Sequence, residues 1–304
     1  PAFASLRLAE LVRKGEWLLA GRVGASAARA IGRAPVRGGV GDLLAVERAR
    51  GIRSTWFVLC GRPTWRTFLA GDLTYRPDAP DARGILEDIA RDGHAVGLHG
   101  SFATVTSPTA FTEQRRRLEG LLGRRVQGVR QHFLRFDPER TPPAMRQAGF
   151  RYDSTSGFPD RNGFRLGVAD VLPEWEGPDG DEEPMAQAPF VWMDRALSKY
   201  RRVEDPAVWV ADALELARAC RAVEGLWVGV WHPNLVPALG YPDAPAAFGR
   251  LLDGLLSERP FVGTLDELVA WRRTRAALRV ERMAPDGRFD LEPGSGVPLE
   301  EPAR

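Results

Sequence analysis

The stretch Asp92-Gly-His-Ala-Val-Gly-Leu-His99 combines a helix stop, a short apolar strand and a histidine at the end of that strand. Residues 84–91 before it are typical of a helix, which Asp92 and Gly93 end. The same alternation of helix and strand continues through most of the chain. It predicts a parallel sheet covered by helices.

Working outward, the apolar runs predict seven strands, the stretch at 95–99 included. The other six are expected at residues 54–60, 126–130, around 152, 190–193, 226–231 and 261–262. Helices are expected between them at 5–20, 40–50, 108–122, 141–148, 206–222, 244–257 and 265–277. This order predicts an α/β fold, an irregular (β/α)7-type barrel, whose first strand we expect just before Pro1.

Composition supports one globular unit without a nucleic-acid or membrane-spanning character. The 304 residues are 44% hydrophobic, and 42 basic residues nearly balance 40 acidic ones. The arginines are scattered rather than gathered in a stripe, which argues against a nucleic-acid partner. No apolar run approaches the roughly 20 residues of a transmembrane helix. Residues 6–23 carry Arg, Glu and Lys, so they do not form a signal peptide, and the compartment stays open.

The pattern divides the chain into three parts. Residues 1–48 are expected to be a helical segment packed on the barrel, with membrane-surface binding as the alternative for the amphipathic stretch 5–20. Residues 49–280 form the barrel, and the Pro-, Gly- and Glu-rich residues 281–304 form a poorly ordered tail. Cys60 and Cys220 lie in apolar segments and are expected to be small core residues.

Three of the four histidines follow predicted strands. His99 and His232 close strands, and His132 lies just past the end of another. Because the carboxyl ends of parallel strands meet at one rim, we expect these three imidazoles to share a site. His94 opens its strand and is expected to be a structural residue beneath the barrel.

Several motifs in order resemble the polysaccharide deacetylase group (NodB-like, carbohydrate esterase family four) over residues 40–273. They are Gly51-Ile-Arg-Ser-Thr-Trp-Phe57, Asp92 to His99, Gly128-Val-Arg130, Ala148-Gly-Phe-Arg-Tyr-Asp153 and Val230-Trp-His232. Longer stretches look like a divergent bacterial subgroup associated with surface polysaccharides: 97–101, 130–136, 152–158 and 163–165.

The resemblance implies hydrolysis of an acylated carbohydrate, in which a divalent metal, usually zinc, polarises the carbonyl and activates water. By position, His99 matches the first metal-binding histidine, and His232 matches the late histidine that acts as acid. Arg130 matches the arginine that orients the catalytic Asp. Asp153 corresponds to the acidic residue that supports the acid histidine.

The chain departs from the family pattern at two places. The opening Asp motif, which supplies base and metal-binding carboxylates, is expected just before Pro1. The second metal histidine would fall four residues after His99, where Ala103 stands. His132 is the predicted replacement ligand, with a substrate contact or a hydrogen-bonded loop histidine as the alternatives.

Four further residues are candidates for substrate contact. Arg135 and Arg165 suit an anionic group, Trp175 suits a sugar ring, and Asp194 is a carboxylate at a strand end.

The leading hypothesis is therefore a hydrolase that removes acyl groups, chiefly acetyl, from amino sugars of a surface glycan. One alternative is an inactive glycan-binding or polysaccharide-assembly domain with the same fold. The other is a metal-free amidohydrolase acting on a small non-sugar amide.

Overall fold

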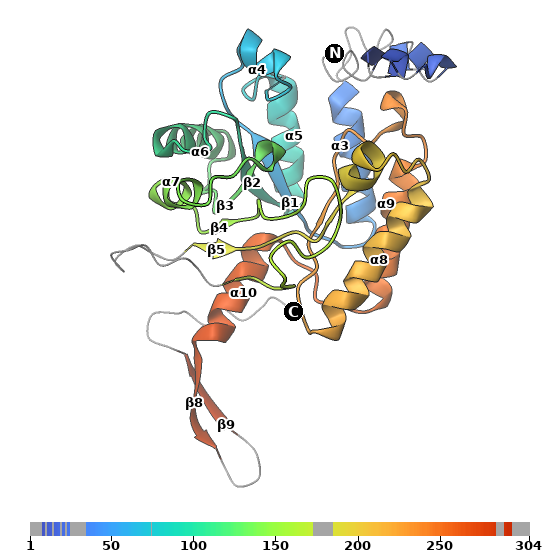
Figure 1. Ribbon diagram of the computed structural model, residues 1–304. Coiled ribbons are helices and arrows are strands. Elements are labelled where there is room, and N and C mark those ends of the chain that lie inside the picture. The colour runs from blue at the N-terminus through green and yellow to red at the C-terminus, as the bar shows by residue number, and fades with distance from the viewer. Residues whose placement is uncertain are drawn as a thin grey trace.

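The computed structural model describes residues 8–9, 11–13, 15–18, 20–21, 23–24, 35–73, 75–172, 185–283 and 289–293 (Figure 1). In chain order the elements are α3 (Pro35–Arg48), β1 (Thr55–Leu59), α4 (Trp65–Leu69), α5 (Pro80–Arg91), β2 (Ala95–Gly100), α6 (Pro108–Leu122), β3 (Gly128–Gln131), α7 (Thr141–Gln147), β4 (Tyr152–Asp153), β5 (Ala186–Gln187), β6 (Trp192–Met193), α8 (Pro206–Ala222), β7 (Gly229–Val230), α9 (Ala244–Ser257), α10 (Leu265–Ala277), β8 (Leu278–Met283) and β9 (Phe289–Pro293).

The strands form a parallel α/β arrangement, as the alternating pattern predicted. Strands β1 to β5 build one five-stranded sheet in chain order, and β6 pairs with β7 in a second, two-stranded sheet. All five of these pairings are parallel. Because each strand lies beside its successor, the carboxyl ends of β1 to β4 share one edge. Among the described residues no ladder joins the two sheets, so the barrel is not closed by hydrogen bonds.

Local signals fix the helices that cover the sheet. Helix α6 starts at Ser107, whose hydroxyl accepts a hydrogen bond from the Ala110 amide, followed by a proline at the first helical position. It ends at Gly123, whose φ of 67° lies in the left-handed region. The apolar face of α6 then packs against the strands: Phe111 and Leu118 belong to one core cluster with Leu98. This packing holds the carboxyl end of β2 in place.

Close strand approach also depends on glycine. A Cβ on Gly128 in β3 would lie 2.1 Å from the ring of Tyr152 in β4, well inside van der Waals contact. Tyr152 itself is buried, and its hydroxyl donates to the Asp266 carboxylate over 2.6 Å. The family-like Gly-Val-Arg motif therefore makes room for a large aromatic side chain next to the site.

The structure corrects the sequence prediction in several elements. The strand expected at 261–262 is wrong: these residues are irregular, and Phe261 is exposed. The short elements α4 and β5 were not predicted. Strands β8 and β9 pair antiparallel and so extend from residue 278 into the range 281–304, which was expected to be a poorly ordered tail. Cys60 and Cys220 are buried free thiols, as expected. No helix among the described residues has the length and apolarity to span a bilayer.

Candidate active site

The three histidines that follow strands line one cavity of about 2060 Å³. His99 is the fifth residue of β2, His132 directly follows β3, and His232 lies two residues after β7. The rings of His99 and His132 are 4.8 Å apart between centroids. Burial, and next the neighbouring His132, hold the pKa of His99 well below its usual value. His99 is thus a neutral imidazole at neutral pH.

Each of these imidazoles is anchored through Nδ1. His99 Nδ1 lies 2.8 Å from the Arg130 carbonyl oxygen, which can only accept a hydrogen bond. Nδ1 of His99 therefore carries the proton, and its Nε2 keeps a lone pair. His132 Nδ1 lies 2.9 Å from Asp72 Oδ1, and His232 Nδ1 lies 2.5 Å from Asp194 Oδ1. A histidine held in this way by a carboxylate or carbonyl is typical of metal ligands and of catalytic acids or bases.

Asp72 is the functional residue that sequence reasoning missed. It lies in the loop after α4 and is only 2% exposed. Its two carboxylate oxygens accept hydrogen bonds of 3.2 and 3.1 Å from the Phe102 amide, in the loop after β2. Asp72 therefore ties the loop after β1 to the loop after β2 while it orients His132. No motif surrounds Asp72 in the sequence, so only the fold identifies it.

The carboxylate behind His232 differs from the predicted one. Asp194, predicted as a substrate contact, is fully buried and directs both oxygens to His232, one to Nδ1 and one to the backbone amide at 2.6 Å. Asp153, predicted to support His232, instead accepts bonds from the amide and hydroxyl of Thr155. Burial raises the pKa of Asp153 to about 6. In the structure, therefore, the carboxylate that holds His232 is that of Asp194.

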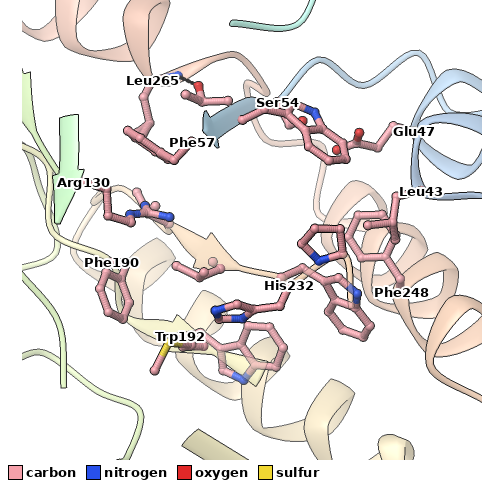
Figure 2. Close-up of a pocket in the computed structure, with 18 of the residues that line it drawn as sticks. Leu43, Glu47, Ser54, Phe57, Arg130, Phe190, Trp192, His232, Phe248 and Leu265 are labelled. Carbon is pink, nitrogen blue, oxygen red and sulfur yellow. Dashed lines mark hydrogen bonds between the residues drawn. The ribbon is translucent and has the colours of Figure 1, made fainter. Parts of the chain in front are cut away.

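Arg130 provides a buried positive charge on the cavity wall. Figure 2 shows it between Phe57 and Phe190, and its guanidinium lies 4.4 and 5.4 Å from the centroids of those two rings. Nε and Nη2 donate to the backbone oxygen and hydroxyl of Ser154 over 3.0 and 2.8 Å. Burial lowers the pKa of Arg130 to about 10, so it stays charged at neutral pH. Such a fixed cation can orient a carboxylate or an anionic substrate group.

Two of the predicted substrate contacts lie elsewhere. Among the described residues that line the cavity, neither Arg135 nor Arg165 is present. Arg135 is exposed and packs over the Phe102 ring at 4.8 Å, and Arg165 donates to the Gly157 carbonyl over 2.8 Å. Trp175 lies outside the described residues.

The residues present fit part of a metal site. His99 and His132 leave their Nε2 atoms free, while the exposed Ala103 contributes no ligand atom. Across the part of the chain that the structure describes, no three His, Cys, Asp or Glu side chains gather closely enough to hold an ion. The pair thus fits two imidazole ligands of a zinc-type set, to which a carboxylate remains to be added.

Comparison with known proteins identifies the fold. The sequence matches no family model and no curated protein. Its structure is similar to that of a provisionally assigned polysaccharide deacetylase from Mycobacterium smegmatis, with 19% identity, 78% of each chain covered and a TM-score of 0.59.

Two further solved structures are similar to the chain. PuuE allantoinase has 18% identity and a TM-score of 0.58, with 81% of this chain and 74% of the other covered. A probable polysaccharide deacetylase from Pseudomonas aeruginosa PAO1 has 18% identity and a TM-score of 0.56, with 77% and 73% covered. The chain therefore has the NodB-like fold of polysaccharide deacetylases, which confirms the fold predicted from the motifs.

Proposed function

We propose that this chain is the catalytic part of a metal-dependent hydrolase that removes acetyl or other acyl groups from amino sugars of a surface glycan. The observation that carries the proposal is the set of three imidazoles around one cavity. Each is anchored through Nδ1, and His99 and His132 lie side by side. Two of the similar solved structures are polysaccharide deacetylases, which supports an acylated sugar as substrate, and the allantoinase among them keeps a small amide as the second candidate.

His99 and His132 are the proposed metal ligands, through Nε2. When bound, the divalent ion, proposed to be zinc, would supply charge that stabilises the oxyanion and lowers the pKa of water. Asp72 and the Arg130 carbonyl fix the tautomer and the ring orientation of the two ligands, as outer partners do in metal sites generally. No general base is assigned among the described residues.

His232 is the proposed general acid. Its Nδ1 is held by Asp194 at 2.5 Å, so the opposite nitrogen is the one available to the cavity. Hydrolysis of an acetamide requires a proton on the departing amine, and a positioned imidazole provides one. Arg130 adds a fixed positive charge to the lining of the same cavity, where it can orient an anionic group of the substrate.

Zinc content and acetate release test these assignments together. The metal-depleted chain is titrated with zinc by calorimetry, beside His99→Ala, His132→Ala and His232→Ala. We expect the first two variants to lose zinc binding and turnover, and the third to keep zinc and lose turnover. Equal zinc retention by the parent and by His99→Ala would contradict the metal assignment.

The substrate panel separates the rival functions. N-acetylglucosamine tetramer and allantoin are supplied to the zinc-loaded and to the metal-depleted protein, and released acetate or opened ring is measured. Acetate release supports the proposal, whereas ring opening without a metal supports an amidohydrolase. Binding of the tetramer with neither reaction supports a glycan-binding domain.

A further inference from the structure

Helix α4 presents an apolar face to solvent. Trp65 and Leu69 are 69% and 71% exposed, Phe68 is also exposed, and no residue of this helix is buried. The spacing of these three residues by three and four positions places them on one face. A capping box between Thr64 and Thr67 holds the helix in shape. Clustered exposed apolar side chains of this kind mark interaction surfaces.

The same surface is positively charged. Arg62 and Arg66 are both exposed, and the Arg66 guanidinium lies 5.2 Å from the Trp65 ring centroid. From position 61 to 76 the only acidic residue is Asp72, which is buried against Phe102 and His132. We call the set Arg62, Trp65, Arg66, Phe68 and Leu69 the α4 patch. It combines aromatic and aliphatic side chains with two arginines that form no ion pair within the part of the chain that the structure describes.

The α4 patch lies on the carboxyl-end side of the sheet, the side on which the three histidines stand. Helix α4 follows the carboxyl end of β1, and Asp72, which orients His132, comes three residues after Leu69. In Figure 1, α4 stands at the end of the molecule toward which β1 runs. The patch and the proposed metal ligands therefore belong to the same, carboxyl end of the sheet.

We propose that the α4 patch binds an anionic membrane surface, with the carboxyl end of the sheet turned toward the lipid headgroups. Trp, Phe and Leu side chains insert at the level where headgroups meet acyl chains, and arginines pair with anionic headgroups. A membrane surface offers both partners in one plane, which matches the mixed composition of the patch. The inference does not depend on the proposed hydrolysis.

Vesicle sedimentation tests the surface without any assay of activity. The full chain is mixed with vesicles of phosphatidylcholine alone and with vesicles that contain phosphatidylglycerol. We expect the chain to sediment with the anionic vesicles and to be released by salt. Replacing both arginines by neutral residues, Arg62→Gln and Arg66→Gln, should weaken binding about thirtyfold, since each arginine near such a surface contributes about fivefold.

A matched pair of double variants isolates the apolar contribution. Trp65→Ser with Leu69→Ser should weaken binding at least fivefold. Val223→Ser with Phe261→Ser should leave binding unchanged. These two residues are 68% and 62% exposed, but Val223 lies before β7 and Phe261 lies before α10, at the opposite, amino end of the sheet. His99→Ala should also bind normally, which separates this inference from the function of the site.

Three outcomes would overturn the proposal. The parent chain stays in solution with both kinds of vesicle, or both double serine variants lose binding equally. In the third, the chain ignores vesicles yet binds a soluble anionic polysaccharide such as alginate, and Trp65→Ser with Leu69→Ser abolishes that binding. The patch would then be a glycan-binding surface.

Discussion

Glu47 at the amino end of the barrel makes stability depend on pH. It lies on α3, is only 4% exposed, and its Oε2 is 3.8 Å from His94 Nε2. His94 Nδ1 accepts a hydrogen bond from the Ser54 amide, so the proton of the neutral ring is on Nε2. The pKa of Glu47 is raised to about 7, chiefly by burial. A hydrogen bond from the Ser54 side chain acts in the opposite direction, and the nearby Asp92 adds to the increase. Figure 2 shows Glu47 and Ser54 on the same side of the cavity, away from Arg130.

The magnitude follows from proton linkage. Between the ordinary pKa of 4.5 and the raised pKa of about 7, the folded chain binds more protons at Glu47 than the unfolded chain does. Folding stability from this residue is therefore fully present below pH 4.5 and is lost as pH rises through 7. The whole loss is about 3 kcal/mol, at about 1.4 kcal/mol per pKa unit, of which about 2.5 kcal/mol falls between pH 5 and 8.

The substitution Glu47→Gln removes the titration while it keeps the shape and the hydrogen-bonding ability of the side chain. Urea unfolding followed by tryptophan fluorescence gives the free energy of unfolding at pH 5, 6, 7 and 8 for the parent and the variant. The difference cancels the contribution of His94, whose pKa burial lowers and which acts in the opposite direction. The variant should gain about 2.5 kcal/mol relative to the parent between pH 5 and 8. Glu87→Gln, at an exposed position of α5, is the control, and a constant difference for Glu47→Gln would refute the reasoning.

Three further substitutions test the site and its support. Asp72→Asn should lower zinc affinity roughly 10- to 100-fold in calorimetry, because the histidine ligand loses its anchor; an unchanged affinity would exclude that role. Asp194→Asn should cut acetate release roughly 100- to 10,000-fold with zinc binding retained, because His232 loses its orientation; loss of zinc instead would make the carboxylate part of the metal site. Gly128→Ala should lower the free energy of unfolding by about 1–3 kcal/mol, since the new methyl group meets the Tyr152 ring; a neutral result in urea unfolding would mean that the ring moves aside.

The convergence of the histidines was within reach of sequence reasoning. Each of His99, His132 and His232 stands at or just after the end of an apolar run, and parallel strands bring such ends to one rim. The location of Asp72 could not be predicted from the sequence, because Asp72 comes from a loop sixty residues before the histidine that it anchors. Loop paths depend on side-chain contacts such as the two bonds to the Phe102 amide, which leave no periodic trace in a sequence.

Short elements were predicted less well than long ones, for a physical reason. Helices such as α8, with 17 residues, repeat their apolar spacing often enough to be recognised. Strand β5 has two residues and α4 has five, so neither completes a repeat. The Phe261-Val262 run reads as a strand by composition alone, yet its side chains are exposed and Leu265 beyond it begins α10.

The choice between Asp153 and Asp194 shows which information the sequence lacks. Both are fully buried and both stand at the end of a short strand, so local pattern does not distinguish them. Strand order does. Asp153 ends β4, which pairs with β3 and β5, whereas Asp194 follows β6, which pairs with β7 in a register that sets Met193 opposite Val230. His232 stands two residues beyond Val230, and Asp194 directly follows Met193. The pairing of β6 with β7 therefore brings the Asp194 carboxylate within hydrogen-bond distance of the His232 ring. The partner of the proposed acid is thus determined by which strands are neighbours, and that follows from the packing of the whole sheet rather than from any single motif.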